Sequence, residues 1–427
     1  MSRIRNKKHN FVVVIHTLFL QLICQKGAKK RRKSMAWIIA FCTVVVMWLD
    51  YLFIKQLRLN SKAQRRWLYM LLTVDILPIA GLTPLYLFSP VSILSLGHVS
   101  QWMMFIFIIL GVARQPFNIA YLISHNRWIR MLGVVCSLIF ASIFIYGTVV
   151  TRTDYTINRI TINSDRLPAS FDGYKIVLFS DLHIKNLVCA TKEISDVVDI
   201  CNSLEPDMIT FCGDLVDVSH IEVTHSIATE LRKLKAKDGV FSVTGNHDIG
   251  VYIRDSIRLT PKENTHRLIA KEQEMGWRVL DNETEYIRQG NDSIAITGIS
   301  FAQSLQEDRH SADHSGVKLD SLYSTLSKEL FNITLSHMPQ LWDNIIKAHP
   351  ADLTLAGHVH AMQIALKVGQ WRISPSMLLY KRWSGLYKEG EQYLYINDGI
   401  GYGLYPTRIG ARPEITLFEL RRNKNHN

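Results

Sequence analysis

The apolar positions of this chain follow two patterns, and the change lies near residue 150. Before it come four long apolar runs, at Met35–Ile54, Leu68–Phe88, Trp102–Ser124 and Met131–Val150. Each has about the 20 residues that a helix needs to cross a bilayer, and Trp, Tyr or basic residues flank it. Four such runs in succession are rare in soluble cores, so we predict four transmembrane helices over residues 35–150.

The charges of the loops between these runs predict an orientation. The first loop carries five Lys and Arg residues, the second carries none, and the third carries Arg127 and Arg130. Loops rich in Lys and Arg face the cytoplasm. We therefore expect a multi-pass protein of the cell (inner) membrane, with the residues after the fourth run on the extracytoplasmic side.

Residues 1–34 do not fit this orientation. Their apolar run, Phe11–Cys24, is short for a membrane span, and the basic run Lys29–Lys33 would face the outside. The conflict disappears if translation starts at Met35. We therefore treat 1–34 as a basic N-terminal segment that is not part of the working protein.

The net charge of +12 is concentrated at the N-terminus. Residues 1–66 hold 15 Lys and Arg and one acid, Asp50, which leaves the rest of the chain close to neutral. This distribution argues against nucleic acid as a partner. Two acids lie in apolar runs: Asp50, which we interpret as an interface residue, and Asp75, for which an ion path stays open. The six cysteines form no CxxC pair and are interpreted as buried apolar residues.

From Thr151 onwards, short apolar runs of strand length alternate with helical segments. We predict strands at Lys175–Ser180, Asp207–Cys212, Val240–Thr244, Asn332–Ser336, Asp352–Ala356, Tyr393–Asn397 and Glu414–Leu420, with an edge strand at Ile157–Ile162. We predict helices at Thr191–Leu204, His225–Leu234, Asn264–Met275 and Leu322–Leu330, and hairpins at Asn291-Asp292 and Val368-Gly369. Residues 151–427 are thus expected to form an α/β domain.

Polar residues gather directly after five of these strands. They are Asp181 and His183; Gly213, Asp214 and Asp217; Asn246, His247 and Asp248; His337; and His358 and His360. Any one of these clusters alone is more often a solvated loop or a hydrogen-bonded residue. Alternate residues of an extended segment point the same way, so each DxH or HxH pair could hold one ion. Ligands bind at the carboxyl ends of the strands in α/β sheets, and we expect the five clusters to meet around Asp214.

The ordered blocks DxH, GDxxD, GNHD, H and GHxH resemble the calcineurin-like metallophosphoesterases, in particular their membrane-anchored bacterial branch. The segments Leu167–Val177 and Arg412–Thr416 match as well, so that the resemblance covers about residues 155–422. It implies a sandwich of two mixed β-sheets flanked by helices for residues 151–427. This domain would follow the all-α transmembrane region of about four helices.

The resemblance also implies a dinuclear metal centre. Asp181, His183 and His360 would hold one ion, Asn246, His337 and His358 the other, and Asp214 would bridge both. These donors suit divalent Mn, Fe, Zn or Co, and the sequence does not identify the metal. Two such ions can clamp both oxygens of an in-line phosphoryl displacement, with a metal-bound hydroxide as the attacking group.

Three further residues receive roles from the resemblance or from their position. His247 matches the family's catalytic histidine, which would stabilise charge at phosphorus or protonate the leaving oxygen. Asp217 matches the acid that orients this histidine. Asp248 is interpreted as a structural hydrogen-bond acceptor.

The chain departs from the family pattern after its last block. Ala361 and Met362 follow His360, where the branch commonly has two glycines. They would restrict the backbone and add bulk at the rim of the site, which affects the shape of the substrate. We interpret Arg408 as a surface charge, although it could line a phosphate pocket.

These observations predict a membrane-anchored phosphoesterase that cleaves phosphomonoester, phosphodiester or pyrophosphate bonds. The neighbouring membrane helices favour lipid-linked substrates and membrane lipids as partners. Hydrolysis of UDP-2,3-diacylglucosamine in lipid A synthesis is an alternative, although that chemistry is expected on the cytoplasmic face. A non-catalytic membrane sensor or binding protein is the alternative of another class, and the loss of a ligand residue would be its mark.

Overall fold

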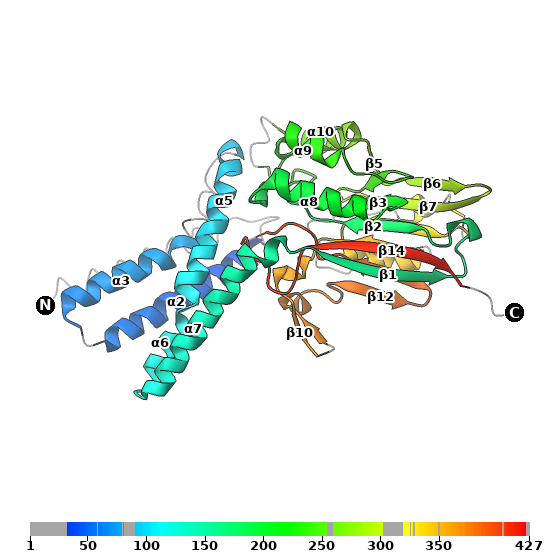
Figure 1. Cartoon of the computed structure of the whole chain (residues 1–427). Helices are drawn as coiled ribbons and strands as arrows, with labels where there is room; N and C mark the ends of the chain where they lie inside the picture. Colours follow the sequence, from blue (N-terminus) through cyan, green and yellow to red (C-terminus); the bar gives the residue numbers. More distant parts are fainter. Residues whose placement is uncertain are drawn as a thin grey trace. The chain divides into compact units, whose positions relative to one another are not determined.

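A computed structural model of the chain describes residues 32–57, 59–78, 80, 90–253, 259–301, 319–324, 326–327, 329–348, 351–369, 371–403 and 405–423 (Figure 1). The chain divides into two compact units. The first consists of Met1–Ala80 and Leu110–Ser137, and the second of Gly81–Ile109 and Leu138–Asn427. Almost all of the predicted N-terminal segment 1–34 lies outside the described residues.

Helices build the described part of the first unit. Helix α2 (Arg32–Gln56) packs against both α3 (Ser61–Asp75) and α6 (Gln115–Ile123). Helix α2 covers the first predicted apolar run. The second run, Leu68–Phe88, is described only in part, since residues 81–89 lie outside the described residues.

Two helices in the described part of the chain are long and apolar enough to cross a membrane. One, Val99–Ile123, joins the end of α5 (Pro90–Phe107) to α6 through a π-helical turn, and the other, Arg127–Thr153, contains α7 (Arg127–Val149). They correspond to the third and fourth predicted runs. The sequence pattern therefore located both helices, although the number of helices in the membrane region stays a prediction.

The acids of the apolar runs form a buried polar cluster inside the first unit. Asp50 and Asp75 are fully buried, and the Arg114 guanidinium makes ion pairs with both, at 2.6 Å to Asp75 Oδ1. Asn118 Nδ2 donates to Asp50 Oδ1 at 2.7 Å, and Gln115 Nε2 donates to the same oxygen at 3.1 Å. The Asp50 carboxylate thus lies among helices, where a buried charge requires such partners, and its position near the membrane interface stays a prediction.

Two six-stranded sheets form the centre of the second unit. One has the order β1-β14-β2-β3-β4-β5, with β1 Thr156–Ser164, β2 Lys175–Phe179, β3 Met208–Phe211, β4 Val240–Ser242, β5 Trp277–Val279 and β14 Glu414–Arg422. The other has the order β12-β13-β9-β8-β7-β6, with β6 Thr284–Gln289, β7 Asp292–Ile299, β8 Asn332–Ser336, β9 Leu353–Ala356, β12 Gly385–Glu389 and β13 Gln392–Ile396. Strands β2 to β5 run parallel, and so do β7, β8, β9 and β13.

The sheets pack face to face with helices on their outer faces. Leu178 and Met208 of one sheet share a core with Ile333 and Leu355 of the other. The outer faces carry α8 (Ala190–Ser203), α9 (His225–Leu231) and α10 (Pro261–Glu274) on the first sheet, and α12 (Leu319–Tyr323) and α13 (Trp342–Ala348) on the second. Because both faces of each sheet are covered, its central strands are continuous apolar runs. This is the predicted α/β sandwich of two mixed sheets.

Most predicted elements of this unit are present, with shifted ends. β1 is an edge strand as expected, and the two predicted hairpins are β6–β7 and β10–β11, where β10 is Leu366–Val368 and β11 is Trp371–Ile373. The helix predicted at Leu322–Leu330 is wrong, because α12 ends at Tyr323. Leu326 still packs into the core of the second sheet, but from a bend and not from a helix.

A buried acid on α10 makes the stability of this unit depend on pH. Glu272 is fully buried and accepts a hydrogen bond from Ser242 Oγ at 2.6 Å. Burial, and then the charge of Asp248, raises the pKa of Glu272 from 4.5 to about 8. A carboxyl group with a raised pKa in the folded state stabilises folding fully below pH 4.5, and that stability is lost as the pH rises towards 8.

We expect Glu272→Gln to remove this loss, since the amide keeps the shape and can still accept the Ser242 hydrogen bond. Relative to the unchanged protein, its free energy of unfolding should rise near pH 8 by on the order of 2 kcal/mol and change little near pH 4.5. Thermal unfolding at the two pH values measures the difference. An equal gain at both values would contradict the assignment.

Candidate metal centre

The predicted site residues lie in the loops that follow β2, β3, β4, β8 and β9, where parallel strands of both sheets end. Five of them have left-handed backbones: Asp181, His183, Asp214, His358 and His360, with φ between 44° and 75°. The expectation that extended segments present the DxH and HxH pairs is therefore wrong. Left-handed turns present these pairs instead. Such turns cost about 1–2 kcal/mol per residue and are concentrated at functional sites.

Two glycines let these loops approach one another closely. A Cβ atom on Gly245 would collide with Asp214 Oδ1, and one on Gly357 would collide with Asp181 Oδ2. A side chain at either position would push a carboxylate out of the site. This steric requirement explains the glycine that precedes Asn246 and the one that precedes His358.

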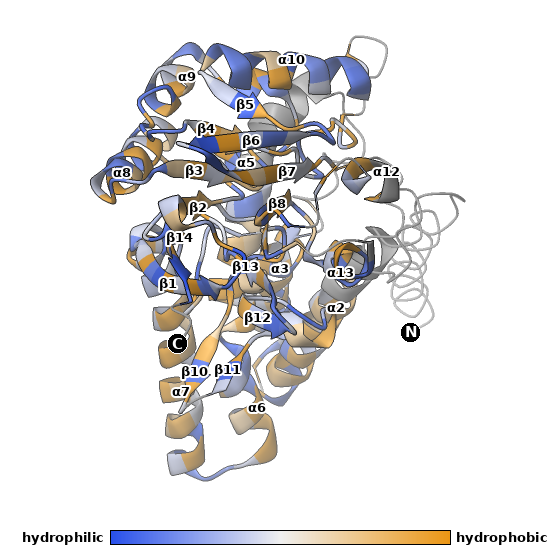
Figure 2. Ribbon diagram, turned by 90° about the vertical axis from the view of Figure 1, so that its right-hand side faces the viewer, coloured by the Kyte–Doolittle hydropathy of each residue, from blue (hydrophilic) through white to orange (hydrophobic). Residues whose placement is uncertain are grey.

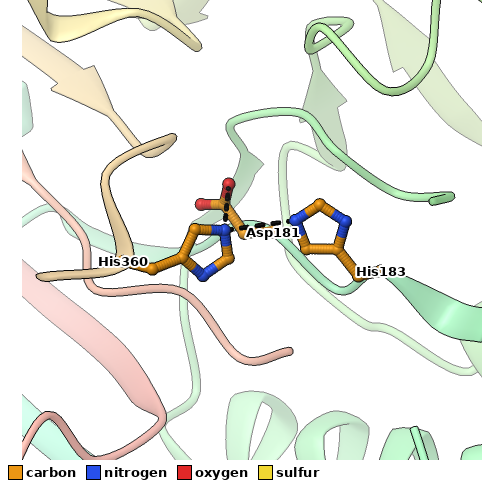
Figure 3. Close-up of side chains that lie close together, drawn as sticks. All are labelled: Asp181, His183 and His360. Carbon is orange, nitrogen blue, oxygen red and sulfur yellow. Dashed lines mark hydrogen bonds and ion pairs between the residues drawn. The ribbon is translucent and has the colours of Figure 1, made fainter. Parts of the chain in front are cut away.

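The first group of donor atoms comes from Asp181, His183 and His360, which face one another within 4.8 Å (Figure 3). His360 Nε2 lies 3.1 Å from Asp181 Oδ1 and 3.1 Å from His183 Nε2. His183 Nε2 also lies 3.7 Å from Asp214 Oδ2. The structure thus brings together the three residues predicted to hold one ion.

The second group of donors converges on His337. Its Nε2 atom lies 3.2 Å from each of Asp214 Oδ2, Asn246 Oδ1 and His358 Nδ1. Its Nδ1 atom lies 2.7 Å from the Cys212 carbonyl oxygen, which can only accept, so Nδ1 donates to it and Nε2 is the nitrogen that faces the site. Asp214 Oδ2 is therefore common to both groups, as a bridging ligand requires.

His247 lies beside the first group and is held by Asp217. Its Nδ1 atom donates to the Asp217 main-chain carbonyl oxygen at 2.6 Å. The Asp217 carboxylate is farther away, with Oδ1 3.6 Å from both His247 Nδ1 and His183 Nδ1. The main chain of Asp217 thus orients His247, which leaves Nε2 of this imidazole available for a substrate.

Comparison with known proteins agrees with this geometry. Residues 174–362 match the calcineurin-like phosphoesterase family. The chain is 32% identical over 266 residues to the uncharacterized metallophosphoesterase YkuE of Bacillus subtilis, over 61% of this chain and 84% of that protein. The chain belongs to the calcineurin-like phosphoesterase family. This metallophosphoesterase is thus a hydrolase of a family that is typically dinuclear and metal-dependent.

Two other relatives of this metallophosphoesterase bear on its surroundings. A transmembrane protein with metallophosphoesterase domain of Bos taurus is 27% identical over 355 residues, which cover 79% of this chain and 74% of that protein. The UDP-2,3-diacylglucosamine pyrophosphatase LpxG of Chlamydia muridarum is 25% identical over 304 residues, which cover 59% of this chain and 86% of that protein. The name of the Bos taurus protein and the two apolar helices agree with membrane association.

The electrostatics of the metallophosphoesterase site fit a pair of divalent cations. Burial lowers the pKa of both His183 and His337, but neighbouring carboxylates outweigh this effect. Asp217 and Asp214 raise the pKa of His183 to about 9, and Asp214 raises the pKa of His337 to about 9. Carboxylates that hold protons on imidazoles so strongly would also favour cations in their place. Carboxylate, imidazole and amide donors are those that Mn, Fe, Zn or Co accept.

Three supporting residues hold the metallophosphoesterase loops. Asp248 accepts from the backbone N–H groups of Asp214 and Gly245 at 2.7 Å each, in agreement with its predicted role as an acceptor. Glu222 accepts from the N–H groups of 217, 218 and 219, at 2.7 to 3.1 Å. Tyr252 stacks on the His247 ring, with centroids 4.3 Å apart. We did not predict Glu222 or Tyr252; the capping-box spacing of Ser219 and Glu222 could have revealed the former.

The residues that replace the family's glycines adopt the conformation that glycine favours. His360, Ala361, Met362 and Gln363 have φ of 51°, 48°, 46° and 62°, so that four successive residues are left-handed. The predicted restriction of the backbone at Ala361 and Met362 thus takes the form of backbone strain directly after His360, a predicted metal ligand. Ala361 is fully buried, and it therefore adds no bulk to an open rim.

Arg408 lies in the interior of this metallophosphoesterase, and its interpretation as a surface charge is wrong. The side chain is fully buried and donates to the carbonyl oxygens of Asp398, Gly401 and Ala411. Its Nη2 atom lies 3.5 Å from His360 Nδ1. Burial lowers the pKa of Arg408 to about 10, so it stays charged at neutral pH behind a predicted metal ligand.

Proposed function

We propose that the protein is a membrane-anchored, dinuclear-metal phosphoesterase that hydrolyses phosphomonoester, phosphodiester or pyrophosphate bonds of lipid-linked substrates. The observation that carries the proposal is the position of Asp214 Oδ2, 3.7 Å from His183 Nε2 and 3.2 Å from His337 Nε2. One carboxylate oxygen shared by two sets of donors is the arrangement that a pair of ions requires.

In this proposal Asp181, His183 and His360 hold one ion, Asn246, His337 and His358 hold the second, and Asp214 bridges them. When bound, the pair would supply Lewis acidity at the phosphoryl group. His247 would act through its Nε2 atom on the leaving oxygen, as a proton donor or by stabilising the charge that develops there. The Asp217 carbonyl oxygen would keep Nδ1 protonated, so that Nε2 is always the atom that faces the substrate.

We propose further that residues 35–150 form four transmembrane helices, that residues 1–34 are absent from the working protein, and that 151–427 face the extracytoplasmic side. The loop charges support this orientation. Contacts within the second unit support a substrate in the membrane: Gln101 Nε2 on α5 donates to the Gly403 carbonyl oxygen at 2.6 Å. Helix α5 also packs against the turn Ile184–Asn186, directly after His183.

The likeness to LpxG favours one alternative, a pyrophosphate hydrolase that acts on a lipid nucleotide such as UDP-2,3-diacylglucosamine. That reaction is expected at the cytoplasmic face, which the loop charges do not favour for this domain. A non-catalytic sensor is the second alternative. All seven predicted ligand residues are present and converge, which gives no reason to expect that catalysis has been lost.

The test is turnover of bis-p-nitrophenyl phosphate by the full chain in detergent, after removal of metals and addition of Mn, Fe, Zn or Co. We expect turnover with at least one metal, its loss with a chelator, and its return when that metal is restored. Absence of turnover with all four metals would favour the sensor.

A further inference from the structure

Strands β10 and β11 form a two-stranded hairpin that belongs to neither of the large sheets. Leu366 lies opposite Ile373, Lys367 opposite Arg372, and Val368 opposite Trp371. Residues directly opposite each other share a face of the ladder. One face of the hairpin is therefore wholly apolar, and the other carries both cations.

The apolar face is open, and a second apolar segment extends it. Leu366, Val368, Trp371 and Ile373, which we call the hairpin face, are each 48–69% exposed. The turn after β11 adds Met377–Leu379, in which Leu378 is 88% exposed. Two-stranded hairpins are marginal in water, and contiguous apolar surface of this kind marks an interaction site.

Contacts on the other side fix the direction of the hairpin face. Arg372 makes an ion pair with Asp398, and its guanidinium lies 5.4 Å from the centroid of the Trp383 ring. Ser374 Oγ donates to the Ala361 carbonyl oxygen at 2.7 Å. The cationic face is thus held against the domain, so the apolar face points away from it.

The base of the hairpin is joined to the end of a helix that can cross a membrane. Ala365 N donates to the Ile409 carbonyl oxygen at 2.8 Å, and Arg408 N donates to the Gly147 carbonyl oxygen of α7 at 3.2 Å. Thr148 and Thr407 share a hydroxyl hydrogen bond at 2.6 Å. The hairpin therefore starts at the level of the last turn of α7. In Figures 1 and 2 it extends from the sandwich on the side where α7 arrives.

The same segment forms the edge of the metal centre. His358 and His360 precede β10 by a few residues, and the Tyr380 ring after the Met377–Leu379 turn lies 6.4 Å from the His358 ring. A molecule bound along the hairpin face would thus have one end near the predicted metal ligands. A phosphate ester with acyl or prenyl chains fits such a position, because its phosphate end is polar and its chains are apolar.

We propose that the hairpin face and Met377–Leu379 insert into the lipid bilayer beside α7, and that lipid-linked phosphate esters reach the metal centre along them. This inference rests on the proposed function and names the route of its substrate. The occupant of the surface is the membrane itself, since the surface continues from the end of α7.

Insertion can be measured in the full chain reconstituted in vesicles of phosphatidylcholine and phosphatidylglycerol. Serine first replaces four cysteines, Cys24, Cys42, Cys136 and Cys189, so that they do not take up the label. A nitrobenzoxadiazole label is then attached at Leu378→Cys. The control carries the label at Asn291→Cys, on the exposed β6–β7 turn. We expect blue-shifted emission, and quenching by lipids with acyl-chain nitroxides, only for the label at 378. Equal behaviour of both labels would overturn the proposal, and so would disulfide cross-linking of two copies through position 378.

The route is tested with Trp371→Ser/Ile373→Ser, with Trp371→Phe/Ile373→Leu as the apolar control. Phosphatidic acid and a polyprenyl diphosphate in vesicles serve as lipid substrates, and bis-p-nitrophenyl phosphate as the soluble one. The serine variant should lose at least about tenfold in kcat/KM on the lipid that the unchanged protein hydrolyses, while the control loses little. Its kcat/KM on the soluble diester should not change.

The outcomes separate the two proposals. An unchanged protein that hydrolyses neither the soluble diester nor a lipid would refute the proposed function. An unchanged protein that hydrolyses the diester but neither lipid would overturn only the lipid route. Equal lipid turnover by the serine variant and the unchanged protein would overturn it as well.

Discussion

His247→Ala is expected to keep both metal ions and to lose most of the turnover, by about 10²–10⁴-fold in kcat. The imidazole lies beside the first donor group, and its hydrogen bond goes to the Asp217 main chain, not to a shared carboxylate. Its removal takes away a group that acts on the substrate and leaves the predicted ligands in place. Metal content by elemental analysis and turnover of bis-p-nitrophenyl phosphate, measured on the same samples, test both halves.

Asp214→Ala is the matched variant, and it is expected to lose metal as well as activity. Its Oδ2 atom lies near both donor groups, and its Oδ1 atom accepts from His247 N at 2.8 Å. Without it, the imidazoles of His183 and His337 lose the negative charge that raises their pKa, and cations at the site lose the same stabilisation. Equal metal loss in the two variants would refute the separation of roles.

The sequence revealed the position of the site because the strands that lead into the site are buried on both faces and are therefore easy to recognise. Strands β2, β3, β4, β8 and β9 are covered on both faces and therefore read as short apolar runs. Parallel strands of one sheet present their carboxyl ends at one edge, so the polar residues after β2, β3 and β4 were expected to meet, and so were those after β8 and β9. Asp214 and His337 follow strands of different sheets, and the family resemblance is what assigned them to one site.

The backbone geometry of the site could not be predicted from the same pattern. Alternation predicts that Asp181 and His183 point the same way only if the chain is extended, whereas both residues are left-handed. Left-handed residues other than glycine depend on contacts with the rest of the loop, such as the close approach of Gly357 to Asp181. Residue spacing along one segment does not contain those contacts.

Two buried charged residues also depend on contacts with other segments that the sequence pattern does not contain. Asp50 and Arg408 are ordinary surface or interface residues by composition, yet both are fully buried. Their partners come from other segments: Arg114 for Asp50, and the carbonyl groups of 398, 401 and 411 for Arg408. Burial of a charge is decided by such partners, and a single sequence does not show which segments will supply them.

Arg408→Met is therefore expected to destabilise the second unit strongly, by about 3–5 kcal/mol in the free energy of unfolding. The methionine fills a similar volume, but the carbonyl groups of Asp398, Gly401 and Ala411 lose their donors inside the protein. The buried carboxylates of Asp398 and Glu414, whose charges favour the charged form of Arg408, also lose a nearby cation. Chemical denaturation of the protein in detergent measures the loss.

Two controls separate this loss from the general effect of removing an arginine. Arg408→Lys keeps the charge but offers its N–H donors from one nitrogen and not from three, so its stability should lie between that of the methionine variant and that of the unchanged protein. Arg412→Met removes a half-exposed arginine whose partner is the half-exposed Asp154, and such pairs contribute at most about 1 kcal/mol. If Arg408→Met were as stable as Arg412→Met, the guanidinium would not hold the loop behind His360. The strain of the left-handed residues 360–363 would then have to be balanced by other contacts.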